Sequence, residues 1–230
     1  MELSLIFESL IQTLNAVPGT LLMAVIILFS SLILGAVIVY IQSLHIPVIH
    51  QILITLKSFI RGTPNVVLLF IMYYSFPFAA AWVLSFINID INPYQMSPVI
   101  IVIITFTVCY SVFQSEILRG ALKSLDYHQV EAAHSLGYDT FQTLRKVIIP
   151  QVLREALPDI VNTLLLIVKA LSLAFLVTVV DIFAQARLTG AENFSYLESF
   201  FAAVLIYWIL GGLITTFSNR IEKKLNRGQY

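Results

Sequence analysis

The sequence predicts an all-α polytopic membrane protein with about five transmembrane helices. Hydrophobic residues make up 59% of the 230 residues and charged residues only 11%, with a mean hydropathy of +0.90, whereas a soluble domain carries about 25% charged residues. Several apolar stretches reach the length of about 20 residues that a helix needs to cross a bilayer. Lys and Arg are distributed unevenly between these stretches, as expected when only one side faces the cytoplasm.

Five apolar stretches are long enough to form transmembrane helices, in which every backbone polar group is satisfied within the helix. They run at about Thr20–Ile41, Pro64–Phe86, Pro98–Leu118, Ile160–Phe183 and Tyr196–Phe217. The sequence contains no long linker or polar domain between them. We therefore expect a single transmembrane domain over residues 1–230, with its core at about 18–225.

The second stretch is the least regular of the five. A shorter apolar segment at about Val48–Ile60 precedes it. Pro47, Pro64 and Pro77 are expected to break this region into pieces, because proline cannot donate the helical hydrogen bond. Thr63 is expected to cap the helix that Pro64 opens, since proline suits the first helical position.

The orientation follows from the basic residues, which are enriched in cytoplasmic loops. They gather between the first and second spans, between the third and fourth, and after the fifth: Lys57, Arg61, Arg119, Lys123, Arg145, Lys146, Arg154, Arg220, Lys223, Lys224 and Arg227. The opposite loops hold only Arg187, alongside Asp90, Glu192 and Glu198. We therefore predict that the N-terminus lies outside and the C-terminus in the cytoplasm.

The predicted cytoplasmic loop at about 120–158 carries two helix start signals. Asp126 with a Gln three residues later resembles a capping box, and Asp139 repeats the pattern. Gly137 is expected to end the first short helix in a left-handed conformation. Pro150 is expected to interrupt the second helix. On these signals alone, the loop is a surface-lying connector between two spans.

A longer pattern in this loop resembles the cytoplasmic coupling loop of ABC importer permeases. Glu131-Ala132-Ala133 is followed after three residues by Gly137, and after nine more by an aliphatic residue, any residue, an aliphatic residue and Pro150. Other segments resemble the polar amino-acid branch of that family. Arg61–Pro64 resembles Arg-Gly-Thr-Pro, and Ser115–Gly120 resembles Ala-Glu-Ile-x-Arg-Gly. Lys169–Leu173 resembles Lys-Asp-Thr-Ser-Leu, with Ala and Leu in place of Asp and Thr.

The resemblance implies an ABC type I permease fold and the role of transmembrane subunit in an ATP-driven importer of a polar amino acid or derivative, with cystine as one candidate. The coupling residues would be Glu131, Ala132, Ala133, Gly137 and Pro150. The implied partners are two ATP-binding subunits, a second permease subunit (identical or similar) and an external substrate-binding protein. The chain would bind no cofactor directly, because ATP-Mg would be used by the partner ATPase subunits. A bacterial cell membrane is the implied location.

Polar residues inside the spans are candidates for a substrate path. Lys169 lies about ten residues into the fourth span, where a charge costs at least about 2.5–3.5 kcal/mol. It would line a polar pathway, contact a substrate carboxylate or pair with an acid; the alternative is a structural Lys held between helices. The full set of path candidates is Lys169, Ser172, Tyr110, Ser111 and Gln114. The last three share one helical face, and packing between helices is their alternative role.

Four further residues near the cytoplasmic side are candidates for a gating or structural role: Arg61, Gly62, Glu116 and Arg119. A local ion pair between Glu116 and Arg119, three residues apart, is the simplest expectation for that pair. Asp181 is expected near the outer end of the fourth span, facing water.

The sequence also allows two other classes of protein. An intramembrane enzyme would need a catalytic pair such as Ser172 with Lys169, and a structural or channel-like subunit would need no ATPase partner. The four His residues show no metal-ligand spacing, so we expect no metal site. The sequence has no phosphate-binding Gly-rich loop, so the chain is not expected to bind ATP in the P-loop manner or to act as an enzyme itself.

Overall fold

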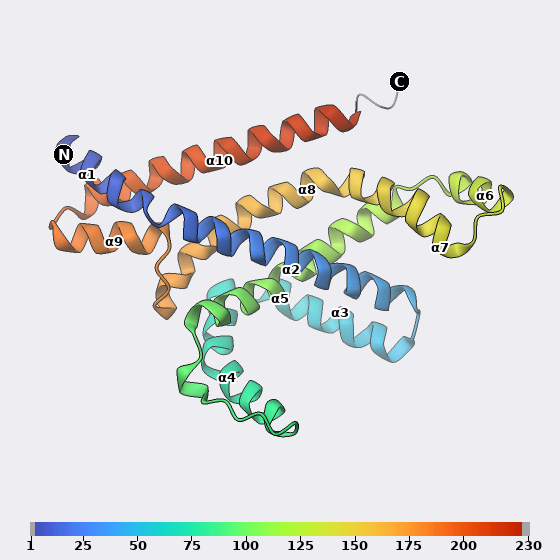
Figure 1. Cartoon of the computed structure of the whole chain (residues 1–230), viewed down its shortest axis with the longest axis horizontal. Coiled ribbons are helices and arrows are strands. Elements are labelled where there is room, and N and C mark those ends of the chain that lie inside the picture. Colours follow the sequence, from blue (N-terminus) through green and yellow to red (C-terminus); the bar gives the residue numbers. More distant parts are fainter. Residues whose placement is uncertain (1–2, 227–230) are drawn as a thin grey trace.

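The computed structural model describes residues 3–226, and over that range the chain is helical without a β-strand (Figure 1). Five helical stretches are long and apolar enough to cross a membrane, as the sequence predicts. They are α2 (Val17–Ser43), α4 (Asn65–Ser85), α5 (Pro98–Lys123), the stretch Thr140–Val177 that contains α8 (Ile149–Ala170), and α10 (Tyr196–Asn226). The shorter elements are α1 (Leu3–Leu14), α3 (Pro47–Gly62), η1 (Pro93–Gln95), α6 (Tyr127–Ser135), α7 (Thr140–Thr143), the π-turn η2 (Leu144–Ile148), the 3₁₀ turn η3 (Leu171–Val177) and α9 (Ile182–Glu192).

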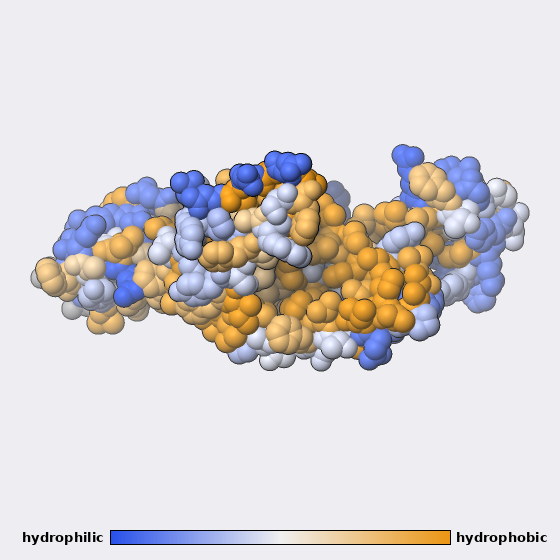
Figure 2. All heavy atoms as spheres, turned by 90° about the horizontal axis from the view of Figure 1, so that it is seen from below, coloured by the Kyte–Doolittle hydropathy of each residue, from blue (hydrophilic) through white to orange (hydrophobic). Residues whose placement is uncertain are grey.

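The described chain is elongated, with α2, α8 and α10 running roughly along its long axis (Figure 1). The α6–α7 region and the C-terminal end of α10 lie at one end, and α1 and α9 lie at the other. Figure 2 shows that hydrophobic residues dominate the middle of one face, while hydrophilic residues gather towards both ends. This distribution fits a molecule whose ends face water and whose middle lies in lipid.

The packing of α2 against α5 forms the centre of the subunit. Gly35 of α2 allows this close approach, because a Cβ atom at this position would lie 2.8 Å from Cβ of Gln114 and 3.0 Å from the carbonyl oxygen of Ser111. Small residues permit such contacts between membrane helices. Phe106 of α5 and Ile167 of α8 are fully buried in the same hydrophobic cluster, so α8 completes this core.

The second span differs from the expectation. Pro64 does separate α3 from α4, but Pro77 lies inside α4 without ending it. The predicted cap at Thr63 is wrong. Its hydroxyl donates to the carbonyl of Phe59 at 2.8 Å, so it serves the end of α3, and Pro64 itself occupies the N-cap position of α4.

The fourth span also differs at both ends. Pro150 does not interrupt the helix: the π-turn η2 precedes it, and the helix continues through it as α8. A π-turn changes the hydrogen-bonding pattern where proline has no N–H to donate. At the other end α8 stops at Ala170 and does not reach Phe183: the 3₁₀ turn η3 follows, and it ends at Thr178, which adopts a left-handed conformation with φ of 68°. The chain then restarts as α9.

Candidate functional site

The loop helix α6 is capped by Asp126 and followed by Gly137 as predicted, but the capping box expected with Gln129 does not form. Asp126 caps it by accepting a 3.0 Å hydrogen bond from the backbone N–H of His128. Gly137 follows the helix with φ of 83°, a conformation that strains any residue with a Cβ. Asp139 then starts α7 with both hydrogen bonds of a capping box, to and from Gln142. The local sequence therefore fixes the turn between α6 and α7.

The candidate coupling residues come together at this end of the molecule. Glu131 and Ala132 are exposed on α6, whereas Ala133 is buried. The side chain of Gln151 on α8 donates a 2.7 Å hydrogen bond to that of Gln129 on α6. Gln151 directly follows Pro150, so α6 is tied to the beginning of the fourth span. A displacement of α6 can therefore be passed to α8 through a direct contact.

Large apolar side chains are exposed around α6, at the hydrophilic end of the molecule. Tyr127 is 74% exposed, Leu136 78% and Phe141 68%. Tyr127 and Leu136 lie outside the five stretches that can cross a membrane, and Phe141 lies at the very beginning of the fourth. An exposed apolar cluster with polar neighbours is typical of a protein-docking surface.

Three polar residues of α8 share one exposed face of the helix. Asp159, Asn162 and Lys169 are exposed in the subunit, and their spacing places them on one side of the helix. Lys169 makes no ion pair within the described part of the chain. Because charge is costly in lipid, this face requires either a water-filled path or a second subunit against it.

Ser172 and Lys169, the pair that the alternative of an intramembrane enzyme would need, do not form a dyad. The hydroxyl of Ser172 donates a 2.7 Å hydrogen bond to the backbone carbonyl of Lys169 and not to the side chain of that residue. The structure thus gives no support to an intramembrane enzyme at this pair.

The polar residues of α5 lie in a different environment from Lys169. Tyr110 is 5% exposed, Ser111 2% and Gln114 0%. The hydroxyl of Tyr110 donates to the backbone carbonyl of Leu166 at 3.1 Å, and that of Ser111 to the carbonyl of Val108 at 2.7 Å. The five path candidates therefore form two groups: three pack inside the subunit, and the two on the α8 side lie at or near its surface.

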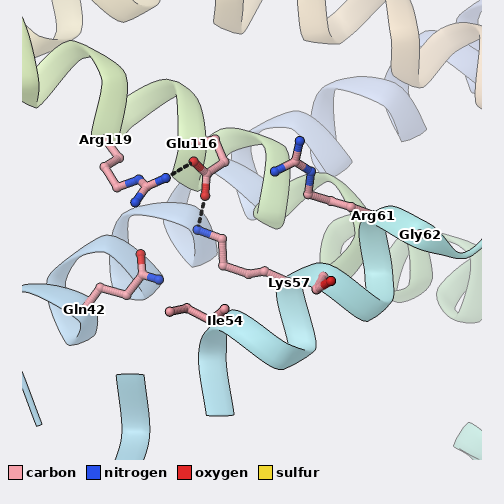
Figure 3. A pocket seen from close by; sticks show the side chains of 8 residues that line it. Gln42, Ile54, Lys57, Arg61, Gly62, Glu116 and Arg119 are labelled. Atoms are coloured by element: carbon pink, nitrogen blue, oxygen red, sulfur yellow. Dashed lines mark hydrogen bonds and ion pairs between the residues drawn. The ribbon is translucent and has the colours of Figure 1, made fainter. Parts of the chain in front are cut away.

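The four gating or structural candidates line one pocket of about 620 Å³ between α3 and α5 (Figure 3). Glu116 and Arg119 form the expected ion pair, with 2.5 Å between a guanidinium nitrogen and a carboxylate oxygen. Glu116 has a second partner that was not predicted from the sequence, the Lys57 ammonium group from α3. Lys57 is 7% exposed, and its position inside an apolar segment was the signal that could have identified it.

Asp181 does not face water as expected; it is fully buried. Its carboxylate accepts hydrogen bonds from the backbone N–H groups of Phe183 and Ala184, at 3.1 and 2.9 Å, and so caps α9. The hydroxyl of Tyr207 on α10 donates a third, at 3.0 Å. Burial raises the pKa of Asp181 above its ordinary value, although these three donors oppose the rise. The Asp that follows the β-branched residues 177–180 was the sequence signal for this cap.

Comparison with known proteins gives a consistent family assignment. The family model described as "Binding-protein-dependent transport system inner membrane component" matches residues 47–227. The chain is 33% identical to the probable amino-acid permease protein YxeN of Bacillus subtilis, over 96% of this chain and 93% of that protein. It is 30% identical to the L-cystine transport system permease protein TcyL of the same organism, over 95% and 90%.

Two solved structures have the same fold. A chain in the crystal structure of an amino acid ABC transporter with histidines superposes with a TM-score of 0.80 at 20% identity, covering 97% of this chain and 99% of that one. A chain of the MetNI methionine ABC transporter in an inward-facing conformation superposes with a TM-score of 0.69 at 18% identity, covering 98% and 99%. At these identities the likeness concerns the fold.

Proposed function

The chain belongs to the binding-protein-dependent transport system inner membrane component family of ABC permeases, and from this premise we propose that it is a subunit of an ATP-driven importer that carries a polar amino acid into a bacterial cell. Partner ATPase subunits supply the energy from ATP-Mg. A second permease subunit completes the pathway, and an external binding protein delivers the substrate. The relatives named as amino-acid and cystine permeases support this substrate class.

The attachment of α6 to the fourth span is the observation that carries this proposal. The Gln129–Gln151 hydrogen bond joins the two helices, and the apolar side chains of Tyr127, Leu136 and Phe141 surround α6 with a surface suited to a protein partner. A partner ATPase that binds here and moves on ATP hydrolysis would displace the N-terminal end of α8. The exposed carboxylate of Glu131 offers this partner a negative charge.

The exposed polar face of α8 supports a substrate path between two permease subunits. Lys169 lies on this face in the last turn of α8, and the same helix is connected to α6 at its other end. Transporter sites commonly lie near the bilayer midplane at the interface of two repeats. A movement that begins at α6 would therefore reach the path along a single helix.

Two variants test this coupling in the complex purified with its ATPase and placed in lipid. Gly137→Val forces a β-branched residue into positive φ, and Glu131→Lys reverses the exposed charge. Both should insert normally, and both should either lose the ATPase or hydrolyse ATP without matching uptake. Uptake and hydrolysis are measured on the same sample.

Matched controls separate coupling from general damage. Gly137→Asn should retain most activity, because Asn tolerates the left-handed conformation better than Val. Glu222→Lys reverses an exposed charge at the same end of the molecule but on α10, which packs against α1, α8 and α9, and should leave uptake unchanged. If both test variants keep the ATPase and transport at the unmutated rate, α6 is a plain connector and the coupling proposal is wrong.

A further inference from the structure

The pocket between α3 and α5 has a strong excess of positive charge. Lys57, Arg61 and Arg119 line it together with one carboxylate, that of Glu116, which leaves two positive charges unbalanced (Figure 3). Glu116 is already engaged by Lys57 and Arg119. Arg61 makes no ion pair within residues 3–226. The pocket therefore favours an anion that supplies oxygen acceptors to Arg61 and its neighbours.

The depth of the pocket matches the level of lipid phosphates. Helix α5 is apolar from its first turn at Pro98, and about 20 helical residues cross the hydrocarbon layer. Counted from Pro98, the hydrocarbon ends at about residue 118, so Glu116 and Arg119 lie at its boundary. Basic pockets between transmembrane helices at such a boundary bind anionic headgroups.

The surroundings of the pocket suit a lipid molecule more than a free solute. Along α3, Val48 is 69% exposed, Ile52 52% and Phe59 55%. Ile54, which lines the pocket, is 43% exposed. Ile54 thus places an apolar side chain beside the charged groups, and Val48, Ile52 and Phe59 give α3 an exposed apolar face on its opposite side that suits contact with acyl chains.

One buried acceptor in the pocket wall narrows the choice of headgroup. The side-chain oxygen of Gln42 is buried and has no hydrogen-bond partner among the described residues. A buried oxygen without a hydrogen-bond donor is energetically unfavourable. A headgroup with a hydroxyl beside its phosphate would supply that donor.

We propose that this pocket binds the headgroup of an anionic, hydroxyl-bearing phospholipid of the phosphatidylglycerol type. The phosphate oxygens accept hydrogen bonds from Arg61 and Arg119, and a headgroup hydroxyl donates to Gln42. The Lys57–Glu116 ion pair holds α3 against α5 and so keeps the pocket open. Glu116 also lines a neighbouring pocket with Glu155 and Asp159, so the site adjoins the polar face of α8.

Native mass spectrometry of the purified protein with added lipid tests the proposal. Phosphatidylglycerol and phosphatidylcholine with identical acyl chains are compared at equal concentration. We expect preferential retention of phosphatidylglycerol, and a roughly tenfold loss of it in Arg61→Gln, since a charge-assisted hydrogen bond contributes about 1.5–3 kcal/mol. Arg61→Lys should retain most of the binding. Arg154→Gln, which removes an exposed charge from α8, should bind as the unmutated protein does.

Competition separates a lipid site from a site for a free anion. Neither inorganic phosphate nor an added amino acid at millimolar concentration should displace the retained phosphatidylglycerol. Displacement by either would show that the pocket takes a free phosphate or carboxylate, and would overturn the lipid assignment. Equal retention of the two lipids, or undiminished binding by a folded Arg61→Gln protein, would overturn it as well.

Discussion

Helices α5 and α8 both carry polar residues within apolar stretches, but those of α5 are buried in the subunit and those of α8 are exposed. On α5, Tyr110 and Gln114 are buried against the rest of the subunit. On α8, Asn162 and Lys169 lie on its surface. Sequence alone makes both sets look alike, since each follows helical spacing within an apolar span. The difference indicates that the polar residues of α5 pack inside the subunit, whereas those of α8 are available to a second subunit or to a substrate path.

The largest expected effect is a loss of stability in a variant that disrupts the packing of α5 against α2. Gly35→Val places side-chain atoms where even a Cβ would lie 2.8 Å from Gln114, and the neighbouring backbone cannot easily move. We expect a loss of about 1–3 kcal/mol in stability, seen as a fall of several degrees in the thermal unfolding midpoint. Gly212→Val on α10 is the matched control, because no heavy atom lies within 4 Å of a Cβ there. Equal midpoints for the two variants would contradict the close packing of α2 on α5.

A second variant tests the exposed polar face of α8, where a substitution should reduce transport and leave folding intact. Lys169→Met removes an exposed charge that has no ion-pair partner within the described chain, so insertion and assembly should persist. If Lys169 binds the substrate, the loss of a charge-assisted contact of about 1.5–3 kcal/mol should lower uptake by roughly tenfold or more. Lys169→Arg, which keeps the charge, should transport better than Lys169→Met. Unchanged uptake by an assembled Lys169→Met protein would exclude a transport role for this residue.

The features that the sequence predicts correctly depend on composition or on neighbouring residues alone. The five spans follow from apolar length, and the α6 ends follow from Asp126 and Gly137, whose capping and backbone preferences are local. The break at Thr178 was not predictable in this way. A threonine with positive φ is held there by its surroundings, including the cap that Asp181 forms on α9.

The candidate site was predicted less completely, because burial depends on which helices meet. The four residues of the α3–α5 pocket were identified individually, but Lys57 was missed as the partner of Glu116, since the two are 59 positions apart along the chain. The path candidates were identified as one set, yet the structure divides them. Helical spacing shows which residues share a face, but the packing of α2 and α8 decides which faces are covered.

The smallest expected effect on stability is that of replacing the buried Gln114, and it shows what this residue does in α5. Gln114 is fully buried, and neither its amide oxygen nor its nitrogen has a hydrogen-bond partner within the described residues. Replacing such a group with an apolar one of similar size is nearly neutral or stabilising. Gln114→Met should therefore keep the unfolding midpoint or raise it slightly, with a gain of at most about 1 kcal/mol.

Uptake by Gln114→Met shows whether α5 only packs inside the subunit or also lines the substrate path with α8. If α5 only packs, transport should stay at the unmutated rate, in contrast to the loss expected for Lys169→Met. A stable Gln114→Met protein that fails to transport would show that the amide is exposed to the substrate in another conformation. In that case Gln114 would belong to the path together with Lys169, and α5 and α8 would line it jointly.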